Sequence, residues 1–309
     1  MPDFTSLKPT DFPERVTVEL TPICNLSCVM CPRHELGDGG YMDAGLFKKI
    51  IDEMAGHPGV ALVPFFRGES LMHPRFFELM RYAKEKNISP IQLTSNATIL
   101  TEKIALQILD LGIDFLSFSL DSNDSEAYRA VRGFDLDRVR QNVERFLELK
   151  KSMGLELPRV QVSAVETEPA RKHIEEFVAY WKDRADRVRI YTEHSRDGVY
   201  GRLDQAPEEF PHRLPCKKPM NEMVIYWDGQ VALCNHDWNR KEFLGDVGKQ
   251  SIQEVWEGAP YQEVRARHLE NRCGQDPTCK GCDHWKVSYL KSGMMGRLYE
   301  KEAPVSPVS

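Results

Sequence analysis

The chain has 309 residues, and its 41 Lys and Arg against 47 Asp and Glu give a net charge of −6 at pH 7. This length predicts two domains, or one large α/β barrel with an appendage. The acidic balance without a long basic block argues against nucleic acid as a partner, and 41% hydrophobic with 28% charged residues excludes a disordered or collagen-like chain. Because we find no signal-peptide pattern and no apolar run of roughly 18 residues, we expect a cytoplasmic protein without a membrane partner.

Six short apolar segments alternate with helical patterns in the first part of the chain. The segments predicted as strands are Arg15–Leu20, Val60–Phe66, Pro90–Ser95, Phe115–Asp121, Arg159–Val165 and Val188–Thr192. Leu46, Ile50 and Met54 recur with helical spacing between the first two strands, and Asp43 and Thr101 are suited to cap the helices that follow them. Repeated βα units favour a parallel sheet, so we predict an α/β fold with a partial (β/α)6 TIM-like barrel at residues 1–195.

The pattern changes after the sixth predicted strand. Residues 196–215 are rich in Gly and Pro, which predicts a linker or a loop over the barrel mouth. Residues 216–297 predict a small α+β, cysteine-rich domain, and the Pro- and Ser-rich residues 298–309 predict a disordered tail.

A β-hairpin and two helices are expected in the small domain. Met223–Trp227 and Gln230–Cys234 flank Asp228-Gly229, a pair typical of a type I′ turn. The two segments with a helical pattern are Ser251–Trp256 and Tyr261–Leu269.

The eight cysteines fall into two groups, which in a chain without an export signal indicates metal binding rather than disulfides. Cys24, Cys28 and Cys31 form a CxxxCxxC motif directly after the first predicted strand. They are therefore expected at the C-terminal mouth of the barrel, where such barrels carry their chemistry. Three thiolates at this spacing suit either a zinc ion with one outside ligand or a [4Fe-4S] cluster with one open iron.

The second group lies in the small domain. Cys216, Cys234, Cys279 and Cys282 place four thiolates on the predicted hairpin and on a CxxC knuckle. This set is sufficient to saturate a metal, and the spacing alone leaves a zinc ribbon and an iron–sulfur cluster open. Cys273 belongs to neither of these two sets of cysteines.

The CxxxCxxC motif after the first barrel strand resembles that of the radical S-adenosylmethionine (SAM) superfamily. The resemblance implies a [4Fe-4S] cluster coordinated by Cys24, Cys28, Cys31 and SAM. Arg67-Gly68-Glu69-Ser70 after the second strand resembles the family's Gly-Gly-Glu-Pro motif but keeps only its central pair. Segments after the third and fourth strands also resemble cofactor-contacting segments, although plain strand-end capping explains them equally well. The residues that the resemblance implies as SAM-binding are Met30, Gly68, Glu69, Ser95, Asn96, Ser119 and Asp121.

The small domain resembles the short "twitch" form of the SPASM extension found in this superfamily. The resemblance implies one auxiliary [4Fe-4S] cluster held by Cys216, Cys234, Cys279 and Cys282. Three interpretations of Cys273 stay open: a small buried residue, a catalytic thiol that gives a hydrogen atom to a substrate radical, or an alternative cluster ligand. Arg202, in the linker, is implied as a catalytic residue that assists deprotonation of the substrate, with an ordinary surface arginine as the alternative.

Among these proteins the chain resembles 2-deoxy-scyllo-inosamine dehydrogenase-like enzymes. The resemblance implies a radical SAM oxidoreductase whose 5′-deoxyadenosyl radical takes a hydrogen from a C–H bond of a small polar molecule, such as a sugar or aminocyclitol. It also implies a reduced flavodoxin or ferredoxin-type protein as electron donor. The alternatives are a redox-neutral sugar epimerase that uses Cys273, a peptide- or protein-modifying maturase, and a noncatalytic protein with two zinc sites.

Overall fold

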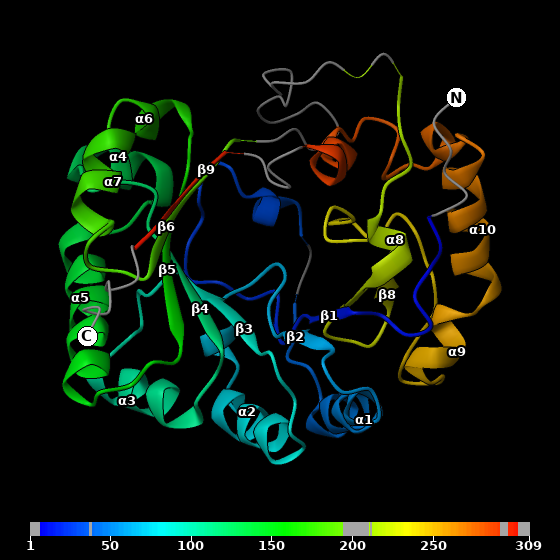
Figure 1. Ribbon diagram of the computed structural model, residues 1–309, viewed down its shortest axis with the longest axis horizontal. Coiled ribbons are helices and arrows are strands. Elements are labelled where there is room, and N and C mark those ends of the chain that lie inside the picture. Colours follow the sequence, from blue (N-terminus) through cyan, green and yellow to red (C-terminus); the bar gives the residue numbers. More distant parts are fainter. Residues whose placement is uncertain (1–6, 37–38, 194–209, 211, 291–295, 302–309) are drawn as a thin grey trace, which may run out of the picture.

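The computed structural model of the protein describes residues 7–36, 39–193, 210, 212–290 and 296–301 (Figure 1). All six predicted barrel strands are present. They are β1 (Arg15–Val18), β2 (Ala61–Val63), β3 (Gln92–Ser95), β4 (Phe115–Ser119), β5 (Arg159–Val165) and β6 (Arg187–Tyr191). The helices that accompany them are α1 (Ala44–Ala55), α2 (Phe76–Glu85), α3 (Glu102–Leu111), α4 (Ser125–Arg132), α5 (Leu136–Ser152), α6 (Glu168–Arg171) and α7 (Ile174–Trp181).

The six strands form a parallel arc in chain order. β1 pairs with β2, and β3, β4, β5 and β6 pair in succession, always parallel. A single parallel bridge between Leu62 and Ile91 joins the two sheets. The predicted α/β class and the partial (β/α)6 barrel are therefore confirmed.

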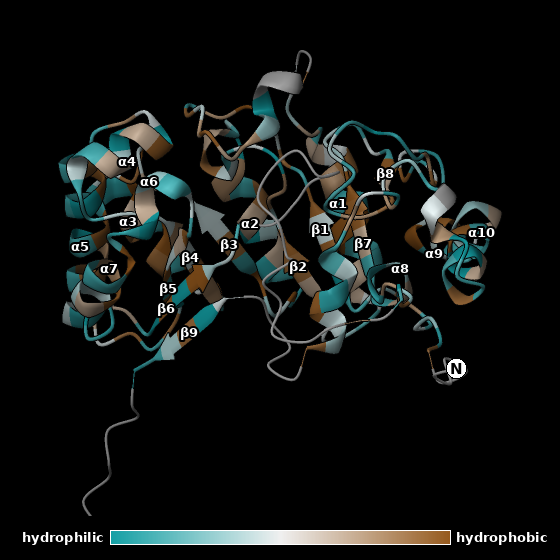
Figure 2. Cartoon of the chain, turned by 90° about the horizontal axis from the view of Figure 1, so that it is seen from above, coloured by the Kyte–Doolittle hydropathy of each residue, from teal (hydrophilic) through white to brown (hydrophobic). Residues whose placement is uncertain are grey.

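The barrel core lies between the strands and the helices. The α1 residues Ile50 and Met54 are buried at the predicted helical spacing, together with Phe47, whereas Leu46 is only partly buried. The cap residues Asp43 and Thr101 accept backbone N–H groups at the starts of α1 and α3. Figure 2 shows brown, hydrophobic residues gathered on the strands and teal, hydrophilic residues on outer helices such as α5. None of the helices in the described ranges has the combined length and hydrophobicity that a membrane span requires.

The cysteine-rich segment continues the barrel sheet. β7 (Glu222–Ile225) pairs in parallel with β1, and β8 (Val231–Ala232) pairs antiparallel with β7. The remaining elements of this segment are α8 (Lys218–Asn221), α9 (Ile252–Trp256), α10 (Ala259–Leu269) and the 3-10 turns η4 (Cys273–Gln275) and η5 (His284–Tyr289). The hairpin and both predicted helices are thus present, and the hairpin is joined to the barrel by backbone hydrogen bonds.

Two details of the sequence prediction are wrong. The hairpin loop is not a type I′ turn, because that turn needs positive φ at both central residues and here only Gly229 has it, at +91°. Gly229 N–H donates to the Tyr226 carbonyl at 2.9 Å, as in a three-residue loop with a glycine bulge. The prediction of a disordered tail at residues 298–309 is also wrong for its first residues, because β9 (Arg297–Glu300) pairs antiparallel with β6. Residues 302–309 lie outside the described ranges.

Candidate active site

The first cysteine group opens onto a cavity at the C-terminal ends of the barrel strands. Cys24, Cys28 and Cys31 follow β1 and line this cavity, which has a volume of about 190 Å³. Its other lining residues are Leu26, Met30, Phe65, Phe66, Arg67, Gly68, Glu69, Thr94, Ser95, Asn96, Ser119, Arg132 and Trp238. Among the side chains that the structure describes, this lining contains no fourth thiol and no imidazole, so the donor set fits a cluster with one open iron better than a closed zinc site.

Two of the three sulfurs accept side-chain hydrogen bonds. Arg132 donates from Nη1 to Cys28 Sγ at 3.4 Å, and Asn96 donates from Nδ2 to Cys24 Sγ at 3.7 Å. Burial raises the pKa values of the Cys24 and Cys28 thiols above that of an ordinary cysteine. Since cluster ligation needs the thiolate, these donors stabilise the form of the cysteines that binds metal.

Glu69 is held in place beside the cysteine loop. Its Oε2 accepts the Asn96 backbone N–H at 2.7 Å and its Oε1 accepts the Leu71 backbone N–H at 3.3 Å. The carboxyl is buried, and this burial raises its pKa. Six of the seven residues predicted to bind SAM line the cavity: Met30, Gly68, Glu69, Ser95, Asn96 and Ser119.

Asp121 is the exception. It is buried, adopts a positive φ of 70°, and is absent from the cavity lining. Its carboxylate forms an ion pair with Arg132 and accepts the Val165 backbone N–H at 2.7 Å. Asp121 therefore holds the arginine that donates to Cys28, and no motif in the sequence marks Arg132 for this position.

Gly68 lies where a side chain cannot fit. A Cβ at this position would stand 2.1 Å from the Thr21 carbonyl oxygen and 2.6 Å from that of Ile23, and the next residue, Glu69, donates its N–H to Ile23 O at 2.9 Å. The loop after β2 thus packs directly on the backbone that leads into the first cysteine.

We expect Gly68→Ala to displace the cysteine loop and to lower both the iron content and SAM cleavage, because backbone atoms cannot yield as a flexible side chain can. Iron analysis and quantification of 5′-deoxyadenosine measure this effect. The matched control is Gly274→Ala, where no atom outside the adjacent part of the chain lies within 4 Å of the added Cβ. Wild-type iron content and cleavage in Gly68→Ala would contradict the prediction.

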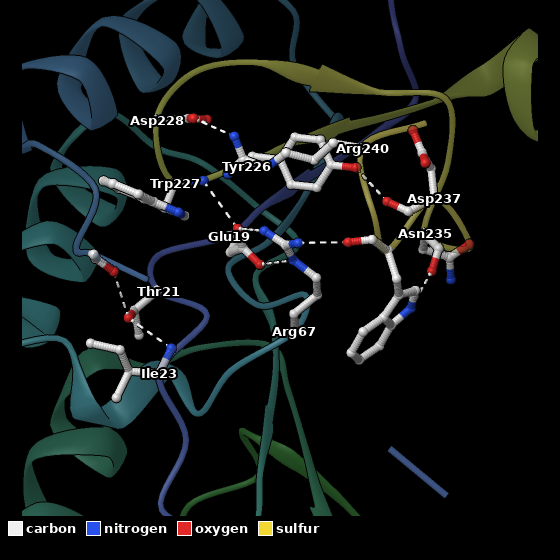
Figure 3. A network of polar contacts seen from close by, with 12 residues as sticks. Glu19, Thr21, Ile23, Arg67, Tyr226, Trp227, Asp228, Asn235, Asp237 and Arg240 are labelled. Carbon is white, nitrogen blue, oxygen red and sulfur yellow. Dashed lines mark hydrogen bonds and ion pairs between the residues drawn. The ribbon is translucent and has the colours of Figure 1, made fainter. Parts of the chain in front are cut away.

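Arg67, which stands where the family motif has its first glycine, connects the cavity to the cysteine-rich segment (Figure 3). Its guanidinium makes two hydrogen bonds to the Glu19 carboxylate, at 2.6 and 2.8 Å, and one to the Trp238 carbonyl at 2.7 Å. Glu19 also accepts the Trp227 backbone N–H at 3.2 Å, and the guanidinium lies 4.6 Å from the Tyr226 ring centroid. The pair is buried, with 7% of Arg67 and 0% of Glu19 exposed.

The second cysteine group also gathers at one place. Cys216, Cys234, Cys279 and Cys282 line a single enclosed cavity, so the structure brings together all four predicted ligands. Burial raises the pKa of each thiol, to about 11 for Cys282, and for Cys234, Cys279 and Cys282 the negative charges of neighbouring cysteines add to the effect. Four buried thiols that line one cavity and disfavour ionisation on their own fit a bound metal or cluster, which stabilises the thiolates.

Further contacts support this site. His236 donates its backbone N–H to Cys234 Sγ at 3.4 Å, and Arg213 donates to the carbonyls of Cys279 and Cys282 at 2.7 and 3.2 Å. His268 also lines the cavity, and burial lowers its pKa to about 4, which keeps the ring neutral at pH 7.

A third cavity, of about 330 Å³, lies between the two cysteine sites and shares lining residues with both. It shares Phe65, Phe66 and Trp238 with the first site, and Lys218 and His236 with the second. The other lining residues are Arg15, Thr17, Val63, Glu222 and Asn235. Most of these side chains are polar, so the cavity offers hydrogen-bonding groups to a small molecule.

Of the two residues predicted to be catalytic, the structure describes only Cys273. Cys273 is 0% exposed and packs in the hydrophobic core. It lines none of the three cavities described above, so the structure supports the interpretation of a small buried residue. Arg202 lies outside the described residues.

Comparison with known proteins agrees with the fold and with both cysteine sites. Residues 18–157 match the radical SAM superfamily, and residues 216–283 match the SPASM iron–sulfur cluster-binding domain. The chain therefore contains a radical SAM domain and a C-terminal SPASM domain. Its cofactors are SAM, a [4Fe-4S] cluster at the first cysteine group and an auxiliary iron–sulfur cluster at the second.

Two relatives cover most of the chain. The tungsten-containing aldehyde ferredoxin oxidoreductase cofactor-modifying protein of Pyrococcus furiosus is 25% identical over 88% of this chain and 89% of its own length. The S-adenosyl-L-methionine-dependent 2-deoxy-scyllo-inosamine dehydrogenase of Niallia circulans is 23% identical over 88% of this chain and 93% of its own.

Solved structures share the fold. BtrN in complex with AdoMet and 2-DOIA matches with a TM-score of 0.57 and 20% identity, covering 87% of this chain and 92% of that one. Streptococcus suis SuiB bound to S-adenosylmethionine matches with a TM-score of 0.72 and 16% identity, covering 95% and 78%.

Proposed function

We propose that the protein oxidises an alcohol carbon of a small polar substrate, such as a sugar or an aminocyclitol. The observation that carries the proposal is the polar cavity that shares walls with both cysteine sites. A substrate bound there touches the SAM cavity on one side and the auxiliary site on the other. The dehydrogenase relative, which covers most of the chain, supports the same chemistry.

The auxiliary site gives the proposed oxidation a place for its second electron. When bound, the reduced cluster and SAM supply a 5′-deoxyadenosyl radical that removes a hydrogen atom from a C–H bond. A cluster held by the four cysteines would accept the second electron, and the substrate, having also lost its hydroxyl proton, would leave as a ketone. The products are then the ketone, methionine and 5′-deoxyadenosine. A reduced flavodoxin or ferredoxin-type protein is the proposed donor of the first electron.

The polar residues of the middle cavity are proposed to orient the substrate. Lys218 and Glu222 form an ion pair at 2.8 Å, and the attraction of Glu222 helps to raise the pKa of Lys218 despite the opposing effect of burial. The ammonium therefore stays charged and can donate to a substrate hydroxyl. Glu222 is the carboxylate among the described lining residues, and we assign it to receive the hydroxyl proton.

Product mass distinguishes oxidation from the alternatives. The reconstituted protein is incubated without oxygen with dithionite, SAM and a panel of sugars, aminocyclitols, peptides and the tungsten-containing oxidoreductase cofactor. We expect a polar small molecule to lose two hydrogens for each 5′-deoxyadenosine formed. A product of unchanged mass that carries solvent deuterium would instead support epimerisation, and a modified peptide would support a maturase. Either result would overturn the proposal.

Lys218→Met should raise the KM for the accepted substrate about tenfold or more, because it removes a charged hydrogen-bond donor worth about 1.5–3 kcal/mol. Lys217→Met is the matched control, since Lys217 is the adjacent lysine, is exposed and does not line the cavity. An iron content near that of the wild type would show that each variant retains both clusters. An unchanged KM with intact clusters would remove Lys218 from the substrate site.

A further inference from the structure

A buried histidine bridges two ligands of the auxiliary site. His268 lies on α10, is 0% exposed, and faces the cavity lined by the four cysteines. The Cys216 backbone N–H donates to His268 Nδ1 at 3.2 Å, and His268 Nε2 lies 3.7 Å from Cys279 Sγ. The imidazole thus contacts the first and third cysteines of the set, which are far apart in the chain.

These two contacts determine where the ring carries its proton. A nitrogen that accepts a hydrogen bond has no hydrogen of its own, so the bond from Cys216 leaves Nδ1 unprotonated. The single proton of the neutral ring then sits on Nε2, which points at Cys279 Sγ. The backbone of one cysteine therefore orients a side-chain donor towards the sulfur of another.

We propose that His268 tunes the reduction potential of the auxiliary cluster by donating its Nε2–H to Cys279 Sγ. Hydrogen bonds to cluster sulfurs favour the reduced state, because reduction adds negative charge to the sulfurs, and they raise the potential. A higher potential makes the cluster a better electron acceptor. Only this consequence for turnover rests on the proposed oxidation; the effect on the potential does not.

A different role for the same histidine makes a different prediction. The ligand atoms of His268, Asp276 and Cys279 lie within 4.8 Å of one another, so these residues could also share a metal ion. Asp276, however, is already in an ion pair with Arg267 at 2.7 Å, and Nδ1 of the ring is occupied by Cys216. The contacts in the described structure therefore favour donation to sulfur over ligation.

The test measures the auxiliary cluster alone. Replacing Cys24, Cys28 and Cys31 with alanine removes the other cluster, and the midpoint potential of the remaining one is titrated by EPR. In this background His268→Leu is expected to retain about four irons per chain and to shift the potential to more negative values. His268→Gln, which keeps an N–H donor, should recover part of the shift, and His57→Gln, at an exposed histidine, should cause none. An unchanged potential in His268→Leu with intact iron would overturn the proposal.

A spectroscopic measurement covers the case in which His268→Leu does not fold. Proton ENDOR of the reduced auxiliary cluster in the otherwise unchanged protein should show an exchangeable proton coupling that disappears in D2O. The coupling should be weaker, but still present, in His268→Gln, which keeps an N–H donor in a different geometry. A strong nitrogen coupling would identify His268 as a direct ligand, and absence of the exchangeable proton would show that no such hydrogen bond exists. Either result contradicts the proposal. If the potential shifts as expected but no substrate is oxidised, the proposed function fails while this inference stands.

Discussion

Replacing Cys28 with alanine should abolish SAM cleavage and leave the auxiliary site loaded. Cys28 is one of three thiols around the first cavity, and the lining supplies no fourth thiol to replace it. We expect the iron content to fall from about eight to about four per chain, because a [4Fe-4S] cluster with an open iron needs all three cysteines. Iron analysis and quantification of 5′-deoxyadenosine after addition of dithionite and SAM measure both effects.

Two cysteine variants serve as controls for this experiment. Cys279→Ala should also lose about four irons but should continue to cleave SAM, since Cys279 belongs to the auxiliary site. Cys273→Ala should retain about eight irons, because this cysteine lies in the hydrophobic core and not at either cavity. Continued SAM cleavage in Cys28→Ala would refute the assignment of the first cluster.

Replacing Arg67 with methionine should lower the free energy of unfolding by about 3–5 kcal/mol, because it leaves the buried Glu19 carboxylate without its partner. Glu19 is 0% exposed and would keep only the weaker bond from the Trp227 backbone, at 3.2 Å. Urea unfolding of the reconstituted protein, followed by circular dichroism without oxygen, measures the loss.

An exposed ion pair and a double variant test the cause of this loss. Arg145 and Glu102 are 3.2 Å apart with about half of each side chain exposed, so Arg145→Met should cost less than about 1 kcal/mol. The double variant Glu19→Leu/Arg67→Met should be more stable than Arg67→Met alone, since it removes the unpaired charge as well. Equal stability of Arg67→Met and Arg145→Met would show that the buried pair has no special role.

The barrel and the cysteine sites could be predicted from the sequence because their signals are local. Strand and helix periodicity lies within a few residues, and CxxxCxxC and CxxC place their ligands on single loops. The residues that support the sites could not be found in this way. Arg132 reaches Cys28, and His268 reaches Cys216 and Cys279, only after the chain has folded. Their identity depends on tertiary contacts that no spacing encodes.

The connection between the barrel and the cysteine-rich segment could not be predicted from the sequence either. The sequence pattern of β7 predicts one strand of a local hairpin. Its parallel pairing with β1 joins positions more than two hundred residues apart. In the same way, the strand β9 lies mostly where a tail was predicted from the Pro- and Ser-rich end of the chain, and its pairing with β6 makes it part of the sheet. Such pairings depend on which edge is open, and a local pattern does not determine this.

The parallel ladder between β1 and β7 means that the two cofactor-binding parts are not independent modules. The strand that leads into the first cysteine loop is hydrogen-bonded along Arg15–Val18 to the strand of the SPASM hairpin. A hinge motion of the SPASM domain away from the barrel would break this ladder and expose an unpaired strand edge in the centre of the molecule. The spacing between the two cysteine sites is therefore built into one continuous sheet and is set when the protein folds.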